Sequence, residues 1–151
     1  MEQLIEHITQ TQNISLQQLD YLLNTDDRDL IEKLRKVAQE TAQSVYGNKI
    51  FIRGLIEFTN YCKNDCYYCG IRKSNRCVDR YRLEKETILA CCCQGYELGF
   101  RTFVLQGGED MFFTDDYVCE IVSSIKENYP DCAVTLSIGE RSRESYQRFR
   151  D

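Results

Sequence analysis

The sequence predicts an α/β fold, in which a parallel sheet with helices outside it follows a helical N-terminal segment. Two observations lead to this class. Apolar residues recur at three- and four-residue spacing through positions 1–48, and from position 49 strand-like runs alternate with helical patterns. Three strand–helix repeats in that order require crossover connections, which place the strands parallel. We therefore expect a helical preamble at 1–48 and a partial core domain at 49–151.

Three helices are expected in the preamble. The first is short, and the second can be capped by Ser15. The third begins at Asp26 or Asp27 and has the most regular pattern, and Gly47 lies where a left-handed C-terminal cap is expected. Its apolar face would be formed by Leu30, Leu34, Val37, Ala38, Thr41 and Val45.

The core domain contains three predicted β/α units. Runs rich in β-branched and aromatic residues predict strands at 50–58, 102–106 and 133–138. Helical patterns follow the first and the last of these strands, at 83–98 and 143–150. The helix after the second strand has an apolar stripe formed by Val118, Ile121, Val122 and Ile125.

A (β/α) barrel of the TIM type is favoured over a doubly wound sheet, but three units cannot close a barrel. Barrels of eight units typically need about 250 residues, whereas this sequence has 151. The sequence therefore looks truncated, and its third strand would present an unpaired edge. We expect the fragment alone to be prone to aggregation and incomplete as an enzyme.

Charge and composition narrow the class of function. The net charge of −5 disfavours a nucleic-acid partner, which would require a basic face. The apolar stretches are too short to span a membrane, and no secretory signal is evident, so we expect a cytoplasmic protein that binds neither nucleic acid nor membrane. Nine cysteines, an odd number without a signal peptide, argue against a disulfide framework and make metal or cluster binding the first hypothesis.

Three of these cysteines, Cys62, Cys66 and Cys69, lie within eight residues directly after the first predicted strand. That position is the carboxyl edge of a parallel sheet, where sites assemble in α/β folds. A four-iron cluster held by three thiolates has one iron without a protein ligand, and this iron can bind a small molecule. Two alternatives remain open. Cys77 could complete a zinc site, or Cys77 or another thiol could complete the ligation of an iron–sulfur electron carrier.

The spacing C-x3-C-x2-C, with the aromatic Tyr68 directly before the last cysteine, resembles the motif of the radical S-adenosylmethionine (SAM) family. The resemblance implies the N-terminal portion of a radical SAM barrel and two cofactors, SAM and a [4Fe–4S] cluster held by Cys62, Cys66 and Cys69. In this family the amino and carboxylate groups of SAM bind the open iron. An electron from the reduced cluster then breaks the C5′–S bond and gives a 5′-deoxyadenosyl radical.

A second motif, Gly107-Gly108-Glu109-Asp110, follows the second predicted strand. Glycines allow the backbone to approach a ligand closely, and a carboxylate can accept hydrogen bonds from an ammonium group. The motif is similar to the GGE-type motif of the radical SAM family. That resemblance implies that Glu109 binds the amino group of SAM and that Gly107 and Gly108 shape the turn.

Two further residues are candidates for contact with the cofactors. Glu140 ends the third predicted strand and would contact SAM or substrate, or would be a solvated acid that begins the next helix. Tyr68 is similar to the family's aromatic residue whose backbone lies by the adenine, and its side chain would then cover the cluster.

Five other cysteines, all of them after Cys77, are expected to be small core residues. Cys91, Cys92 and Cys93 are consecutive on a predicted helix, so their side chains point about 100° apart and cannot converge on one metal. Cys119 and Cys132 are also expected in the core. The single histidine, His7, is expected on the surface.

Longer runs narrow the resemblance. The HydE family of [FeFe]-hydrogenase maturases is similar to this sequence at residues 55–62, 68–72, 75, 80–83, 104–106, 108–110 and 135–140. This resemblance implies a role in assembling the H-cluster of hydrogenase, with the radical acting on a small-molecule or iron-complex substrate. It also implies other hydrogenase maturases as partners and an electron donor such as ferredoxin or flavodoxin.

Biotin synthase and methylornithine synthase are the alternative families. In biotin synthase the third cysteine is usually followed by a Pro-Gln type sequence, whereas here Gly70-Ile71-Arg72 follows it. Methylornithine synthase is more similar, and the later barrel strands that would discriminate are absent from this sequence. A non-enzymatic interpretation is a further alternative, in which the chain binds a cluster or zinc without turnover.

Overall fold

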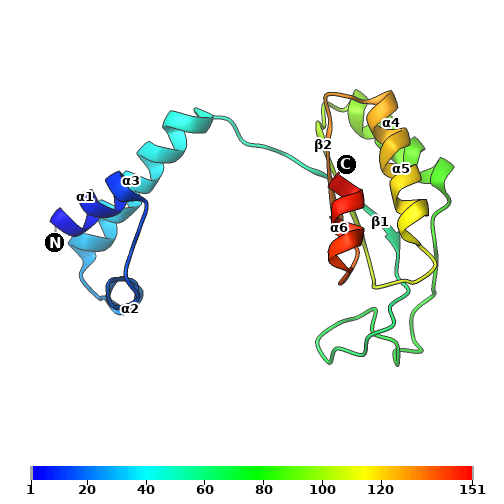
Figure 1. Ribbon diagram of the computed structural model, residues 1–151, viewed down its shortest axis with the longest axis horizontal. Helices are drawn as coiled ribbons and strands as arrows, with labels where there is room; N and C mark the ends of the chain where they lie inside the picture. The colour runs from blue at the N-terminus through cyan, green and yellow to red at the C-terminus, as the bar shows by residue number, and fades with distance from the viewer. Residues whose placement is uncertain (1, 151) are drawn as a thin grey trace. The chain divides into compact units, whose positions relative to one another are not determined.

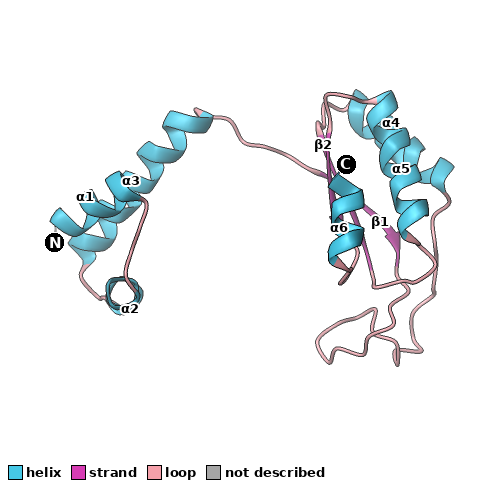
Figure 2. Cartoon of the chain, in the orientation of Figure 1, coloured by secondary structure: helices cyan, strands magenta, loops and turns pink. Residues whose placement is uncertain are grey.

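A computed structural model describes residues 2–150 and divides the chain into two compact units, residues 1–50 and 51–151. The described residues form six helices and three strands (Figures 1 and 2). The division between the units falls two residues after the boundary expected at 48. None of the helices in the described part of the chain has the length and apolar character needed to cross a membrane.

The first unit consists of three helices, α1 (Glu2–Thr11), α2 (Leu16–Asn24) and α3 (Arg28–Tyr46). Ser15 caps α2 as expected, because its side chain accepts a hydrogen bond from the amide of Gln18 and the Gln18 side chain accepts one in return. Asp27 caps α3, and Gly47 ends it with a φ of 63°. The local signals for these helix ends are therefore confirmed.

The predicted apolar face of α3 is largely open within its own unit. Leu30 is buried, and Leu34 and Val37 are half-buried. The remaining three members of this face, Ala38, Thr41 and Val45, are exposed. A unit of three short helices encloses little apolar surface, so half of this face stays exposed within the unit.

The second unit is a parallel sheet with three helices. Its elements are β1 (Gly54–Thr59), α4 (Lys85–Glu97), β2 (Thr102–Gly107), α5 (Asp115–Asn128), β3 (Ala133–Ser137) and α6 (Arg143–Arg150). The strands follow one another across the sheet in the order β1-β2-β3, and both pairs are parallel. The predicted α/β order is confirmed.

The first strand starts later than the sequence pattern predicts. Pairing with β2 begins at Gly54 and Phe103, so residues 50–53 precede the sheet. Ile50, Phe51 and Ile52 are exposed. Their β-branched and aromatic character suits a strand, but strand formation also requires a paired neighbour.

The core lies on the helical face of the sheet. Ile56 and Phe58 of β1 point to this face, and so do Phe103 and Leu105 of β2. The helices contribute the buried residues Ile88, Cys92, Val118, Ile121 and Ile125. The stripe expected on α5 is confirmed, with Val122 partly buried against the same core. Each large apolar side chain buried here contributes about 1.5–3 kcal/mol.

The opposite face of the sheet carries two rows of side chains that cross the strands. One row is formed by Leu55, Val104 and Thr135, and a second row, closer to the carboxyl ends, by Glu57, Gln106 and Ser137. Apart from the half-buried Val104, these residues are exposed. Coverage of one face only is the arrangement of a (β/α) barrel, since helices cover both faces of a doubly wound sheet.

Candidate functional site

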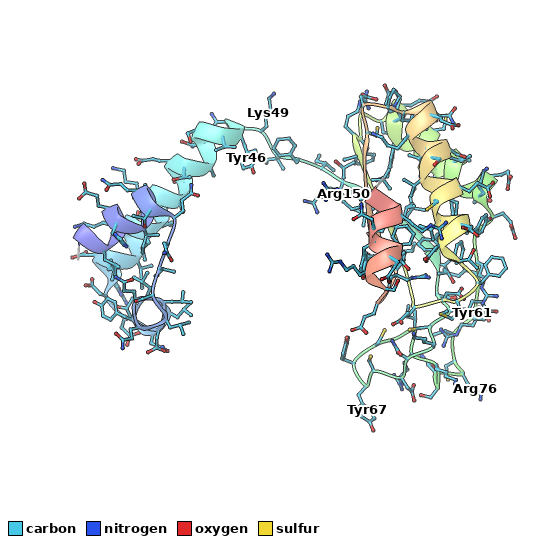
Figure 3. The ribbon with its side chains drawn as sticks, viewed as in Figure 1. Tyr46, Lys49, Tyr61, Tyr67, Arg76 and Arg150 are labelled. Carbon is cyan, nitrogen blue, oxygen red and sulfur yellow. The ribbon has the colours of Figure 1, made fainter. Side chains whose placement is uncertain are left out.

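The three motif cysteines lie in the long loop between β1 and α4, which begins where β1 ends at Thr59. Cys62 and Cys69 are half-buried, and Cys66 is exposed. The amide of Cys69 donates to the carbonyl of Cys66 over 3.0 Å, so the C-x2-C segment forms a tight turn. Figure 3 shows Tyr67 in this turn pointing away from the sheet.

The loop after β2 contacts the start of the cysteine loop through its backbone. The amide of Glu109 donates to the Sγ of Cys62 over 3.4 Å, and the amide of Lys63 donates to the carbonyl of Glu109 over 3.0 Å. A Cβ at Gly108 would overlap the carbonyl oxygen of Tyr61. A glycine is therefore required for the two loops to approach this closely.

The carboxylate of Glu109 lies where three loops meet, and its side chain is only 9% exposed. It pairs with the ammonium of Lys63 and accepts a hydrogen bond from the Asn64 amide over 2.7 Å. The hydrogen bond from Lys63 does most to hold the pKa of Glu109 below its ordinary value, and Asn64 and the backbone amide of Glu140 add to this effect against the opposing effect of burial. The third loop makes room for this carboxylate, because a Cβ at Gly139 would overlap the Glu109 side chain.

Glu140 and Tyr68 do not place their side chains at this point. The Glu140 side chain is exposed, and only its backbone amide reaches Glu109. Tyr68 is 93% exposed. Contact of either side chain with a cofactor stays a prediction.

A polar network that the sequence interpretation did not single out fixes the base of the site. Arg82 donates to both carboxylate oxygens of Asp110, over 2.6 and 2.9 Å, and Thr59 donates to the same carboxylate over 2.8 Å. The guanidinium also lies 4.0 Å from the ring centroid of Tyr61 and 4.7 Å from that of Phe112. Burial opposes ionisation of Asp110, but the bonds from Arg82, the Phe112 amide and Thr59 together lower its pKa.

Nothing in the local pattern around Arg82 would have revealed this network. Its partners lie 23 and 28 residues away along the chain, at the ends of β1 and β2. The sequence does predict two buried strands, β1 and β2, before and after Arg82. Parallel strands end at one edge of the sheet, so Thr59 and Asp110 could be expected to lie near each other.

The expectations for the remaining cysteines are confirmed in part. All nine cysteines are free thiols. Cys92 and Cys132 are buried, and burial raises the pKa of Cys92 to about 12. Cys91 and Cys119 are half-buried, and Cys93 is exposed, so the prediction of a core position was wrong for Cys93 because it lies on the outer side of α4. His7 is exposed, as expected.

The donor set of the cysteine loop suits an iron–sulfur cluster. Within residues 2–150, no group of three or more His, Cys, Asp or Glu side chains could hold a single metal ion. In a four-iron cluster each protein thiolate binds a different iron, so three thiolates on one loop fit such a cluster. The Glu109 amide already donates to one of these sulfurs, as hydrogen bonds to cluster sulfurs do.

Comparison with curated proteins identifies the relatives of this chain. No family model matches it. The chain is 39% identical to the [FeFe] hydrogenase maturase subunit HydE of Thermotoga maritima over 129 residues, which are 85% of this chain and 36% of that protein. It is a radical SAM relative of HydE. The 3-methylornithine synthase of Methanosarcina acetivorans is a further radical SAM relative, 32% identical over 80% of this chain and 35% of that protein.

Solved structures of radical SAM proteins share the fold. The crystal structure of methylornithine synthase (PylB) matches with a TM-score of 0.78 and 26% sequence identity. The alignment covers 97% of this chain and 44% of PylB. The crystal structure of HydG, a maturase of the [FeFe]-hydrogenase, matches with a TM-score of 0.83 and 28% sequence identity. The alignment covers 98% of this chain and 34% of HydG. The expected N-terminal part of a radical SAM barrel is therefore confirmed.

Radical SAM proteins such as HydE, HydG and PylB use two cofactors, a [4Fe–4S] cluster and SAM. The chain spans about a third of the length of the first two curated relatives. This chain contains the cysteine loop, the loop after β2 and the loop after β3, and these three loops meet at Glu109.

Proposed function

We propose that this chain forms the cluster- and SAM-binding part of a radical SAM enzyme. Cys62, Cys66 and Cys69 hold a [4Fe–4S] cluster, and Glu109 accepts hydrogen bonds from the ammonium group of SAM. The observation that carries the proposal is the double contact of Glu109. Its backbone amide donates to the sulfur of Cys62, while its carboxylate is held in the same corner of the site.

The cysteines would bind the cluster, and Glu109 would bind SAM. The thiolate of Cys62 is stabilised by the amide of Glu109, because a hydrogen bond to sulfur favours its charged form. The carboxylate of Glu109 is ionised at neutral pH, since its pKa is lowered. An incoming ammonium replaces that of Lys63, which is half exposed and free to move into water. The chemistry that the cluster supplies is transfer of one electron to SAM, which breaks the C5′–S bond.

Tyr68, Gly107, Gly108 and Glu140 complete the proposed SAM site. Gly107 and Gly108 bring the β2 loop against the cysteine loop without a side chain between them. The backbone of Glu140 orients the Glu109 carboxylate. Tyr68 is exposed on the cysteine loop, where it can cover a bound cofactor.

For the whole protein we propose a HydE-like role in assembly of the hydrogenase H-cluster. The 39% identity to HydE supports this assignment over methylornithine synthase, at 32%. The substrate would be a small molecule or an iron complex, the partners other hydrogenase maturases, and the electron donor a ferredoxin or flavodoxin. Nine free thiols suit a reducing compartment, so we propose a cytoplasmic location.

The cluster proposal is tested with the full-length protein reconstituted anaerobically with iron and sulfide. We expect close to four irons per chain, an electron paramagnetic resonance signal that changes when SAM is added, and formation of 5′-deoxyadenosine. Cys66→Ala should abolish all three. Cys93→Ala is the matched control, since Cys93 is also exposed but lies on α4. Bound zinc, or a cluster that is indifferent to SAM, would refute the proposal.

The HydE-like role needs a separate experiment. The gene should restore hydrogenase activity to a strain that lacks its own HydE, and the purified enzyme should form no 3-methylornithine. Formation of 3-methylornithine without restored hydrogenase activity would replace the HydE-like assignment with methylornithine synthase. The cluster proposal would remain in either case.

A further inference from the structure

The shape of the cysteine loop does not come from regular structure or from a buried core. No helix or strand lies between the end of β1 and the start of α4 at Lys85. Tyr67 and Tyr68, between the second and third cysteines, are 99% and 93% exposed. Polar contacts must therefore set the distance between the three thiols.

One side chain, Arg80, makes four of these contacts. Its guanidinium donates to four backbone carbonyls in the loop. Nη1 contacts the carbonyl of Asn60 and, over 2.9 Å, that of Ile71. Nη2 contacts the carbonyls of Arg72 over 2.7 Å and Asn75 over 3.1 Å.

These carbonyls lie on both sides of the three cysteines. Asn60 is two residues before Cys62, and Ile71 is two residues after Cys69. The guanidinium of Arg80 therefore ties the entrance of the loop to its exit.

The backbone of Arg80 is itself fixed at the base of the loop. The Asn60 side chain donates to the carbonyl of Asp79 over 2.7 Å and accepts from the amide of Tyr81 over 2.8 Å. The Asn60 amide donates to the carbonyl of Tyr81. Asn60 therefore holds the two residues that flank Arg80, and its own carbonyl accepts a hydrogen bond from the Arg80 guanidinium.

We propose that Arg80 is the positioning residue that sets the spacing of the cluster thiolates, an inference that rests on the proposed function. It holds the loop closed before any cluster is present. Arginine suits this role because its planar group carries five donors in fixed directions and is always charged. Lysine keeps the charge but has three donors on a rotating ammonium, so it cannot hold four carbonyls in one plane.

The first measurement is amide hydrogen exchange on the full-length protein without cluster. The amides of Lys73, Ser74 and Asn75 report loop order, because they donate to Asn64, Asp65 and Arg72 inside the loop. In Arg80→Ala these amides should exchange about tenfold faster or more, which is the loss expected for hydrogen bonds to a charged group. Peptides from β2 and α5 should exchange as before.

Arg101→Ala is the matched control. Arg101 also donates to two backbone carbonyls, those of Tyr96 and Phe100, but it precedes β2 at the opposite edge of the sheet. Its loss should leave exchange in the cysteine loop unchanged. Arg80→Lys should give intermediate loop exchange.

The second measurement is iron content and the electron paramagnetic resonance spectrum after reconstitution. Arg80→Ala should lose more than half of the bound iron relative to Arg101→Ala, and the remaining signal should not respond to SAM. Equal loop exchange and iron content in Arg80→Ala and Arg101→Ala would overturn the inference, and so would an Arg80→Lys variant identical to the unsubstituted protein. If the unsubstituted protein takes up no cluster, the proposed function fails, and unchanged loop exchange in Arg80→Ala would separately refute the loop-closing role.

Discussion

The amide of Glu109 donates to the Sγ of Cys62 over 3.4 Å, across 47 residues of sequence. This bond joins the loop after β1 to the loop after β2 at the point where the proposed cluster and SAM meet. The reverse bond from the Lys63 amide to the Glu109 carbonyl makes the junction two-sided. Displacing either loop would therefore disturb the proposed cluster ligands and the proposed SAM contact together.

Gly108→Ala should destabilise the protein and reduce cluster uptake. The new methyl group would overlap the carbonyl of Tyr61 and approach the Cβ of Cys62, so the two loops must separate. We expect a loss of about 1–3 kcal/mol in the free energy of unfolding, measured by urea titration, as for overpacking elsewhere. Gly70→Ala is the control, because a Cβ at Gly70 has no atom within 4 Å. Equal stability of the two variants would contradict the predicted close approach.

Glu109→Gln should weaken SAM binding without reducing iron content. The neutral amide cannot pair with an ammonium group, so we expect the dissociation constant for SAM to rise about tenfold or more. The measurement is a SAM titration followed by the spectrum of the reduced cluster. Glu140→Gln is the comparison, since the Glu140 side chain is exposed and should matter less.

The lowered pKa of Glu109 also predicts how SAM binding depends on pH. The carboxylate stays ionised down to a pH below its ordinary pKa of about 4.3. The contribution of Glu109 to SAM affinity should therefore be constant between about pH 6 and 8. A decline in affinity between pH 8 and 6 that disappears in Glu109→Gln would show that the carboxylate has a raised pKa instead.

Asp110→Asn should destabilise the second unit by more than an exposed ion pair would. It removes the charge that Arg82 neutralises inside a buried network, at a cost of about 1–3 kcal/mol. Arg148→Ala breaks the exposed pair with Asp116 and should lower the free energy of unfolding much less than Asp110→Asn does. Urea unfolding of both variants tests the difference.

The same network predicts a loss of stability in acid. A lowered pKa of Asp110 in the folded state means that its contribution is present above the unfolded pKa of about 3.9 and disappears as pH falls through the lower folded value. Between pH 7 and 5 the Asp110→Asn difference should be constant. Below about pH 4 the unsubstituted protein should approach the variant in stability. A difference that does not shrink at all as the pH falls below about 4 would contradict this linkage.

Thiol labelling should separate the cysteines by burial. Cys66, Cys77 and Cys93 are exposed and should react with iodoacetamide in the native protein without cluster. Cys92 should remain unlabelled until the protein unfolds, because its thiol is buried and its pKa is raised to about 12. Peptide mass spectrometry gives the order of labelling. Early reaction of Cys92 would show that the core between α4 and the sheet opens readily.

The sequence was sufficient wherever structure depends on neighbouring residues. The cap of α2 at Ser15 and the stripe of α5 could be predicted from spacing, because both arise within a few turns of one helix. The start of β1 could not, since it depends on where β2 offers a partner. The exposed position of Cys93 likewise depends on how α4 faces the sheet.

The candidate site could be predicted only at the level of its motifs. The spacing of the cysteines and the two glycines before Glu109 suggested which loops would matter. The roles of Arg80 and Arg82 depend on contacts to backbone and carboxylate groups up to 28 residues away. Such contacts leave no periodic pattern in the sequence, so only the folded chain reveals them.

The uncovered side of the sheet changes character along the strands. Leu55 and Val104 lie side by side across β1 and β2, and one pleat onward Glu57, Gln106 and Ser137 place a carboxylate, an amide and a hydroxyl in line. This face of the sheet is therefore apolar in its middle and polar near the carboxyl ends of the strands, where the cysteine loop begins. A molecule bound against this face would meet apolar side chains along one row and three hydrogen-bonding side chains along the next.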